Sequence, residues 1–401
     1  MKSFIILLVT SLLLSCQSQR QNDLYPVIHL NPDEAGTLNM SDYFDGYKVI
    51  HLRDAICNSI QDYTPFQDKY LTLVDQGVSN VFHVFDREGK SLYQIGDIGR
   101  GPGEYLNAGR DLILDRDSNI LLIAPTQQLK YNIEGSLVDH RQGFPKQASL
   151  GSPKLFLNDS ILIYYKPHFL RSPIKKLLKN PERTNSESYL LTFQETTGNQ
   201  ECRSFFPDHD LEKYDFTPRL YQYKDSCYFY FDADPYIYHL TPQGPIPYYR
   251  IDKGRFSQTK LYQVPSIPTE TITIYALNES HRYLWGEYLF IDHHYLFFYD
   301  KTTGITQNYK HLNNDYLQTD QPNRYFPERY HTELKHKIQC DPDYQYYFYP
   351  PMKFKEIIEY AHSHIPDSEW QEYCRKNPEL IRVYEEIDED SNLVVIGYHF
   401  K

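Results

Sequence analysis

The feature that most constrains the fold is a pattern of three short apolar runs that recurs along the chain. It is clearest in "YLTLVDQGVSNVFHVFDREGKSLYQIG", residues 70–96, and in "ILLIAPTQQLKYNIEGSLVDHRQG", residues 120–143. Each copy has an apolar run, a polar turn, a second apolar run, an x-Gly turn and a third, alternating run, which is the pattern of a three-strand meander. Eroded copies begin at Cys227 and Tyr288, and a fifth copy is interrupted by a basic insert at 167–187.

The glycines of the x-Gly turns repeat at the length of a propeller blade. Gly89, Gly135, Gly198, Gly244 and Gly304 are separated by 46, 63, 46 and 60 residues. A unit of this length cannot bury both of its faces alone, and stacking the units around an axis buries each one against its neighbours. The chain is therefore predicted to be all-β, a six-bladed β-propeller of four-stranded antiparallel blades.

The sixth blade has to be assembled from both ends of the chain. "YQYYFYPP", residues 344–351, and "NLVVIGYHF", residues 392–400, each have the pattern of a strand, and "YKVIHL", residues 47–52, is the candidate to pair beside the last strand. Pairing of the two ends closes the ring and removes its open edge. Between the two C-terminal strands, apolar residues at helical spacing predict a helical insert at about 352–376.

The N-terminal segment "MKSFIILLVTSLLLSCQSQR" is predicted to lie outside the folded domain. Its apolar run, residues 4–14, is about half the length of a membrane-spanning helix, so it indicates a secretory signal over residues 1–15. The ending Leu13-Leu14-Ser15-Cys16 resembles the bacterial lipobox, which implies a mature chain that begins at Cys16 and carries acyl chains there. The alternative is an ordinary cleaved signal in which the cysteine has no role.

These boundaries give the expected organisation of the chain. Residues 16–40 form a tether and N-terminal extension, and residues 41–401 form a single propeller domain. The lipid would hold the protein to the outer membrane of the cell envelope. The stretch "QSQRQN" after the cysteine lacks the acidic residues that often mark surface-exported lipoproteins, which favours the periplasmic face over the cell surface.

Charge and cysteine usage exclude several classes of partner and site. Without the first fifteen residues the formal net charge is (41 − 1) − 53 = −13. A protein this acidic repels nucleic acid and anionic lipid head groups, so we expect no nucleic-acid partner. The remaining five cysteines are scattered and include no C-x-x-C pair, which argues against a disulfide framework or a zinc site.

The glycine-rich segment "IGDIGRGPGEY", residues 95–105, has to be tested against the nucleotide-binding loops that it superficially resembles. A phosphate-binding Walker loop ends in G-K-[ST], but no lysine follows here, and Pro102 has no amide to donate. The spacing is G-x-G-x-G, which differs from the dinucleotide fingerprint, and a strand is predicted to follow. Pro102-Gly103 instead favours a type II turn in a blade-to-blade crossing, with the following Glu and Tyr as anchors. Arg100 is the ligand-binding candidate of this segment.

A second set of candidates lies in the loops that join second and third strands. Carboxylates and imidazoles that converge on a propeller axis can bind Ca²⁺ or a transition metal. The alternative is that each carboxylate caps nearby backbone amides. No H-E-x-x-H motif, G-x-S-x-G elbow or diagnostic Cys/His arrangement is present, so no catalytic residue is assigned. The candidates are Asp75, Asp232, Asp234, Asp292, His293 and His294.

Two further segments carry a resemblance to known proteins. The run from Ile95 to Leu137 resembles an NHL-type repeat, and G-x-G-P-G-E-Y after "FDREGKSLYQIG" is similar to the six-bladed β-propeller lipoproteins of Bacteroidota-type bacteria. The C-terminal "DEDSNLVVIGYHFK" matches the ending typical of that family. Ala124-Pro125 departs from the Val/Ala-Asp that usually ends this strand. The resemblance implies a propeller lipoprotein of the cell envelope.

Aromatic composition and the missing catalytic motifs together favour binding over catalysis. The 38 tyrosines and 22 phenylalanines lie largely in predicted strands, where we expect most of them to pack between blades. A minority on an open face could stack on sugar rings. The leading hypothesis is a lipid-anchored binding or scaffolding module for a glycan, peptide or protein partner.

Two other functions remain open. One is a metal-dependent hydrolase or lyase that resembles the gluconolactonase-like and NHL-type propellers and uses the Asp and His loops. The other is a structural subunit of an envelope assembly that docks through the basic insert at 167–187 and the helical insert at 352–376.

Overall fold

The computed structural model describes most of the chain from Leu24 to its C-terminal end. Cys16 and the signal segment lie outside the described residues, as do Asp292 and the 167–187 insert. The described ranges are 24–66, 68–108, 112–115, 117–123, 127–142, 152–165, 189–195, 201–207, 218–257, 270–291, 293–318 and 339–401.

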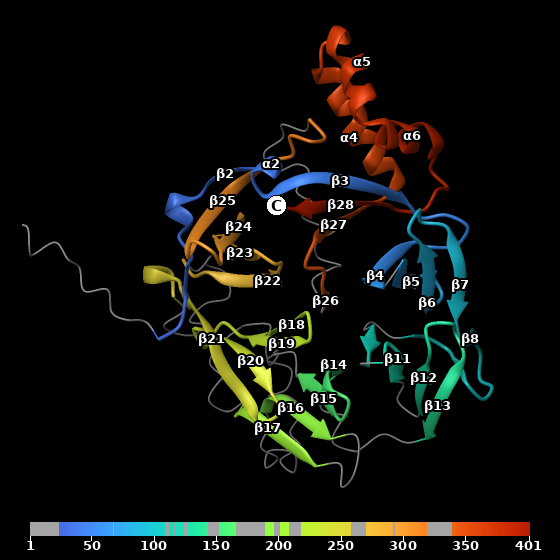
Figure 1. The fold of residues 1–401 in the computed structure, drawn as a ribbon, viewed down its shortest axis with the longest axis vertical. Coiled ribbons are helices and arrows are strands. Elements are labelled where there is room, and N and C mark those ends of the chain that lie inside the picture. The colour runs from blue at the N-terminus through green and yellow to red at the C-terminus, as the bar shows by residue number, and fades with distance from the viewer. Residues whose placement is uncertain are drawn as a thin grey trace, which may run out of the picture.

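Six antiparallel sheets surround a central axis, so the predicted six-bladed β-propeller is confirmed (Figure 1). In each of the first five blades the first strand lies nearest the axis and the fourth lies at the rim. Blade 1 comprises β4 (Ser59–Phe66), β5 (Lys69–Asp75), β6 (Asn80–Asp86) and β7 (Ser91–Ile95), and blade 2 comprises β10 (Ile113–Leu114), β11 (Ile120–Ile123), β12 (Gln127–Tyr131) and β13 (Leu137–Gln142). Blade 3 comprises β14 (Ser152–Asn158), β15 (Ile161–Tyr165), β16 (Tyr189–Glu195) and β17 (Cys202–Pro207).

Blades 4 and 5 are widened by strands from elsewhere in the chain. Blade 4 comprises β18 (Arg219–Tyr223), β19 (Ser226–Tyr230), β20 (Tyr236–Thr241) and β21 (Gly244–Asp252), and blade 5 comprises β22 (Thr273–Glu279), β23 (Tyr283–Phe290), β24 (His293–Asp300) and β25 (Ile305–Asn313). The N-terminal β1 (Val27–His29) and β2 (Gly36–Asn39) add parallel to the rim strands β21 and β25, and β26 (Gln339–Cys340) adds parallel to the inner strand β18. Short 3₁₀ helices follow β1 and β21, at Pro32–Glu34 and Gly254–Phe256.

The sixth blade joins the two ends of the chain, as predicted. Within the described residues it has three strands in the order β27 (Tyr344–Tyr349), β28 (Val394–Phe400) and β3 (Phe44–His51). The last strand therefore pairs on one side with β27 and on the other with the N-terminal β3, in the register Val394↔His51 to Phe400↔Phe44. Helix α2 (Met40–Tyr43) leads directly into β3.

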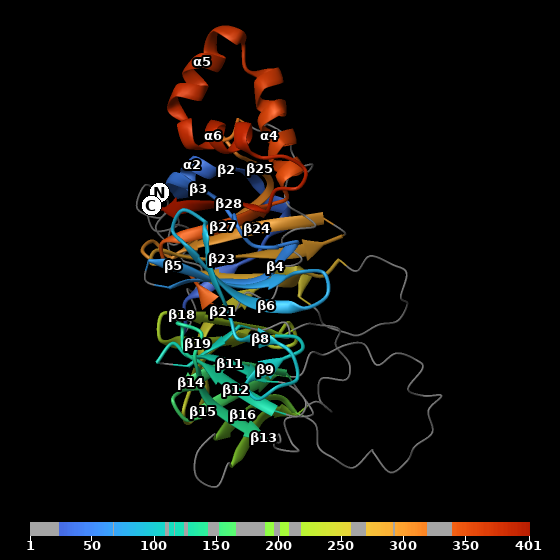
Figure 2. The ribbon, with the colours of Figure 1, turned by 90° about the vertical axis from the view of Figure 1, so that its right-hand side faces the viewer.

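Three helices between β27 and β28 project outward from the ring (Figures 1 and 2). The helical region is longer than the predicted insert, because Pro378 begins a third helix instead of ending the second. Proline is accepted at the first position of a helix, where its missing N–H would have no partner. The helices are α4 (Pro351–His364), α5 (Asp367–Lys376) and α6 (Pro378–Glu386).

Burial along the strands reflects their position within a blade. Second and third strands such as β5, β6 and β15 have unbroken buried runs, because neighbouring blades cover both of their faces. The rim strand β7 is only partly covered. The buried residues accordingly gather into clusters that lie between adjacent blades, and one of these clusters also includes α4 and α6.

Candidate functional site

The glycine-rich crossing from blade 1 to blade 2 is held together by its own residues. Gly103 has a φ of +79°, and the Glu104 N–H donates to the Gly101 carbonyl at 3.1 Å, as the predicted turn at Pro102-Gly103 requires. The Glu104 carboxylate accepts from the Gly101 N–H at 2.6 Å, and the Tyr105 hydroxyl donates to the Ile95 carbonyl at 2.7 Å. The short strands β8 (Asp97–Ile98) and β9 (Glu104–Tyr105) pair within this crossing. The glycines therefore serve the turn itself.

Arg100 lies exposed on this crossing. It is not among the residues that line the hollow described below. Its assignment as a ligand contact stays a prediction.

The carboxylates of the strand-joining loops cap backbone amides. Asp75 accepts from the Gly77 N–H at 2.6 Å, and Asp234 accepts from the Tyr236 N–H at 2.9 Å. Of the two histidines, His293 is exposed and the ring of His294 packs 5.8 Å from the ring of Tyr275.

Asp232 has a different environment, because it is buried between blades 4 and 5. One carboxylate oxygen accepts from Lys253 Nζ at 2.5 Å, from the Tyr230 hydroxyl at 3.0 Å and from the Ile274 N–H at 3.2 Å. Its other oxygen, Oδ2, is buried without a hydrogen-bond partner. Burial lowers the pKa of the nearby Arg219, and the Asp232 charge partly offsets that effect. The structure thus brings Asp232 into an ion-paired cluster with Lys253.

Metal ligation has no geometric support within the described ranges. No three His, Cys, Asp or Glu side chains in that part of the chain lie close enough together to hold a metal ion. Cys57, Cys202, Cys227 and Cys374 are free thiols. In the same ranges no helix combines the length and apolarity needed to cross a membrane.

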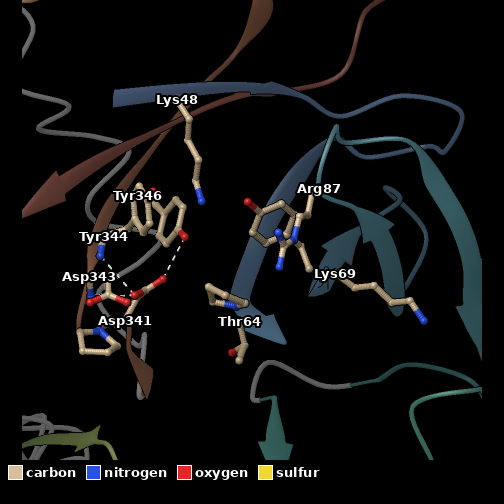
Figure 3. Close-up of a pocket in the computed structure, with 11 residues that line it drawn as sticks. Lys48, Thr64, Lys69, Arg87, Asp341, Asp343, Tyr344 and Tyr346 are labelled. Carbon is tan, nitrogen blue, oxygen red and sulfur yellow. Dashed lines mark hydrogen bonds between the residues drawn. The ribbon is translucent and has the colours of Figure 1, made fainter. Parts of the chain in front are cut away.

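A solvent-open hollow of about 590 Å³ lies between blades 6 and 1 (Figure 3). Its walls come from β3, from the turns that join β4 to β5 and β6 to β7, and from the segment that leads into β27. We call it the interblade hollow. It is lined by Lys48, Thr64, Pro65, Lys69, Tyr70, Arg87, Asp341, Pro342, Asp343, Tyr344 and Tyr346.

Lys48 is the central cation of the interblade hollow. Its ammonium lies 3.7 Å from the centre of the Tyr344 ring, and 5.3 Å and 5.5 Å from the rings of Tyr346 and Tyr70. A cation over aromatic faces is attracted by their quadrupoles. Burial lowers the pKa of the Lys48 ammonium, and the charge of Arg87 lowers it further, while Asp341 acts in the opposite direction. Two cations therefore act on each other in this space.

The two carboxylates of the hollow are engaged by the protein itself. Asp341 accepts from the N–H groups of Asp343 and Tyr344 at 2.9 Å and 3.1 Å, and from the Tyr346 hydroxyl at 2.9 Å. Asp343 lies 3.3 Å from Nε2 of His281, at the exposed rim. These contacts fix the turn before β27 and orient its tyrosines.

One family matches nearly the whole chain. Residues 25–399 match the family described as "Domain of unknown function (DUF4934)". The chain belongs to this family. No curated protein matches the chain.

Solved structures similar to this DUF4934 chain show the same fold at low sequence identity. A candidate exported protein from Bacteroides fragilis is 16% identical, with a TM-score of 0.62 over 94% of this chain and 99% of that chain. A catalytically inactive virginiamycin B lyase from Staphylococcus aureus, solved with quinupristin, is 11% identical, with a TM-score of 0.37 over 69% and 76%. A protein of unknown function from Bacteroides caccae is 11% identical, with a TM-score of 0.31 over 62% and 81%.

The residues of the interblade hollow in this DUF4934 chain are absent from the sequence-based candidates. The available signals were local: one lysine within the predicted strand "YKVIHL", and an acidic turn, "DPDY", directly before the aromatic run "YQYYFY". Neither signal points to the other, because nearly 300 positions separate them and only ring closure brings them together.

Proposed function

We propose that this protein is a lipid-anchored binding module of the cell envelope and that its ligand occupies the interblade hollow. The observation that carries the proposal is the convergence of Lys48 with the rings of Tyr70, Tyr344 and Tyr346 in an open space of about 590 Å³. Volumes of this order are typical of small-ligand sites, in which apolar and aromatic walls carry a few well-placed polar groups.

The architecture supports binding at this position. The walls of the hollow are strands and tight turns of two blades, so a ligand would meet side chains that packing already holds in place. The Tyr346 ring is held by its hydroxyl contact to Asp341, and Lys48 lies on a strand paired along its length with β28. A preorganised site of this kind loses little conformational entropy when it binds.

The test is a binding screen with the full-length protein in detergent against a panel of soluble glycans and peptides. We expect at least one ligand whose binding is weakened about tenfold or more by Lys48→Met or Tyr344→Ala, and unchanged by Lys90→Met. Lys90 is an exposed cation on the β6–β7 turn that does not line the hollow. Ligands that bind equally to all three variants would place the site elsewhere, and release of a cleaved product would favour the hydrolase or lyase alternative.

Lipid anchoring is tested separately, at Cys16. Replacing Cys16 by Ser removes the atom that would carry diacylglycerol. We expect the wild-type protein to fractionate with outer membranes and the Cys16→Ser variant to lose that association. Membrane association that survives the substitution would contradict the anchor.

A further inference from the structure

The interblade hollow contains a positive charge that the protein leaves without a counter-ion. Within the described residues, the Lys48 ammonium contacts only aromatic rings, and it has no hydrogen bond or ion pair. Figure 3 shows Lys48 and Arg87 directed into the space between the two blades, whereas Lys69 is directed away from them. A charge held in such a space without a partner is best matched by an anion from outside.

The carboxylates of the hollow do not already fill this role. Asp341 is occupied by three donors from its own turn and strand, and Asp343 faces His281 at the rim. An exposed carboxylate at the rim can still accept hydrogen bonds from ligand hydroxyls, but it would repel a second negative group placed beside it. The ligand should therefore carry its charge at one end and hydroxyls at the other.

The remaining wall is aromatic and hydroxyl-bearing. Tyr344 and Tyr346 stack with ring centres 5.8 Å apart, which presents two flat rings at one side of the hollow. Thr64, 6% exposed, lies at the wall with its hydroxyl oxygen buried and without a hydrogen-bond partner. Aromatic faces pack well against the C–H faces of a saturated ring, and the tyrosine hydroxyls and Asp343 can pair with its hydroxyl groups.

We infer that the interblade hollow binds a sugar acid, a pyranose ring that carries a carboxylate, free or at the end of an acidic glycan. The carboxylate pairs with the Lys48 ammonium and the Arg87 guanidinium, and the ring lies against the tyrosines. Inorganic phosphate lacks the ring and the hydroxyls that this wall would contact, and an acidic peptide would place further carboxylates beside Asp343. The inference rests on the proposed function, since it names the ligand of the same site.

The experiment compares digalacturonic acid with its dimethyl ester, which keeps the rings and removes the charges. Binding to the full-length protein is measured by calorimetry for wild type, Lys48→Met, Arg87→Met and the control Lys90→Met. We expect the acid to bind wild type and Lys90→Met with similar affinity, and both Lys48→Met and Arg87→Met to weaken it about tenfold or more. We expect the ester to bind wild type about as weakly as the acid binds Lys48→Met. Monogalacturonic acid distinguishes a free sugar acid from a glycan end.

Arg87 is exposed, so its replacement leaves the fold intact even if Lys48→Met lowers stability. Equal binding of acid and ester, or tighter Lys48-dependent binding of triglutamate or inorganic phosphate, would overturn the sugar acid while leaving the hollow as the binding site. If digalacturonic acid does not bind and no ligand of the wider panel depends on Lys48 or Tyr344, the inference and the proposed function both fail.

Discussion

At the scale of single residues, the structure separates charges that stabilise the fold from charges that are available to a ligand. Asp232 and Lys48 are both shielded charges near aromatic rings. Asp232 pairs with Lys253, whose side chain is 6% exposed, and it also accepts from a hydroxyl and a backbone N–H. Lys48 has no such partner in the described chain. Sequence alone could not make this distinction, because the partner of Asp232 is 21 positions away on another segment.

The buried pair predicts a non-additive pattern of stability. Lys253→Met leaves the Asp232 carboxylate buried without its counter-ion, which should lower the free energy of unfolding by about 3–5 kcal/mol. Adding Asp232→Asn removes the charge but keeps an acceptor for Tyr230 and Ile274, so the double variant should recover much of the loss. Urea unfolding of both single variants and the double variant measures this coupling. A double variant that loses the sum of the two single losses would contradict it.

His83 predicts a loss of stability in mild acid. Burial lowers the pKa of its imidazole from 6.5 to about 4. Below pH 6.5 the unfolded chain takes up a proton that the native protein takes up only near pH 4, so stability falls as the pH falls through this window. At pH 4.5 the cost is about 2–3 kcal/mol. His83→Gln should remove this part of the pH dependence in urea unfolding, whereas His140→Gln, at an exposed position, should not; equal profiles for all three proteins would exclude His83 as the cause.

At the scale of elements, the turn between β6 and β7 is the contact that joins the first blade to the closing strand. Gly89 in this turn has a φ of +85°, and its carbonyl accepts from the Arg53 N–H at 2.8 Å, just beyond the end of β3. A Cβ added at this glycine would collide with the carbonyl oxygen of His51 and would lie 2.8 Å from Ile50. The x-Gly repeat read from the sequence therefore has, in this copy, a role in joining neighbouring blades.

Gly89→Ala should lower the free energy of unfolding by about 2–4 kcal/mol, because it combines a left-handed backbone with a backbone collision. Gly46→Ala is the matched control in β3, since nothing lies within 4 Å of its added Cβ. The measurement is the urea midpoint of the two variants. Equal midpoints would show that the turn can shift without cost.

The local elements were accessible to sequence reasoning, and the candidate site was not. The meanders, the turn at Pro102-Gly103 and the closing strand each depend on contiguous patterns of apolar and turn-forming residues. The third helix was missed because Pro378 was taken as an end, although proline also begins helices. The interblade hollow joins Lys48, Arg87 and Tyr344, and no local pattern encodes their proximity.

At the scale of the whole molecule, ring closure makes the stability of every blade depend on the two ends of the chain. Strand β28 pairs with both β27 and β3, and buried residues of these strands belong to the clusters that adjoin blades 1 and 5. Removing β28 would expose two strand edges and open both clusters. The interblade hollow depends on the same closure, because Lys48 lies on β3.

Deletion of residues 392–401 should therefore abolish the cooperative unfolding transition, whereas deletion of Lys401 alone should preserve it. Lys401 is exposed, and it follows the last strand. Calorimetric melting of the two truncated proteins measures the difference. A native-like transition in the longer deletion would show that the ring does not need its closing strand.

The pairing of β3 with β28 also sets an order of events during biosynthesis. The ribosome makes the N-terminal strand first, but the strand that pairs with it is completed only with the last residues, about 350 positions later. Contacts of such long sequence separation form late and slowly. Until release of the finished chain, the first-made strand has an unsatisfied edge, and the interblade hollow cannot exist. Ligand binding at that site would thus report that synthesis and folding have both reached completion.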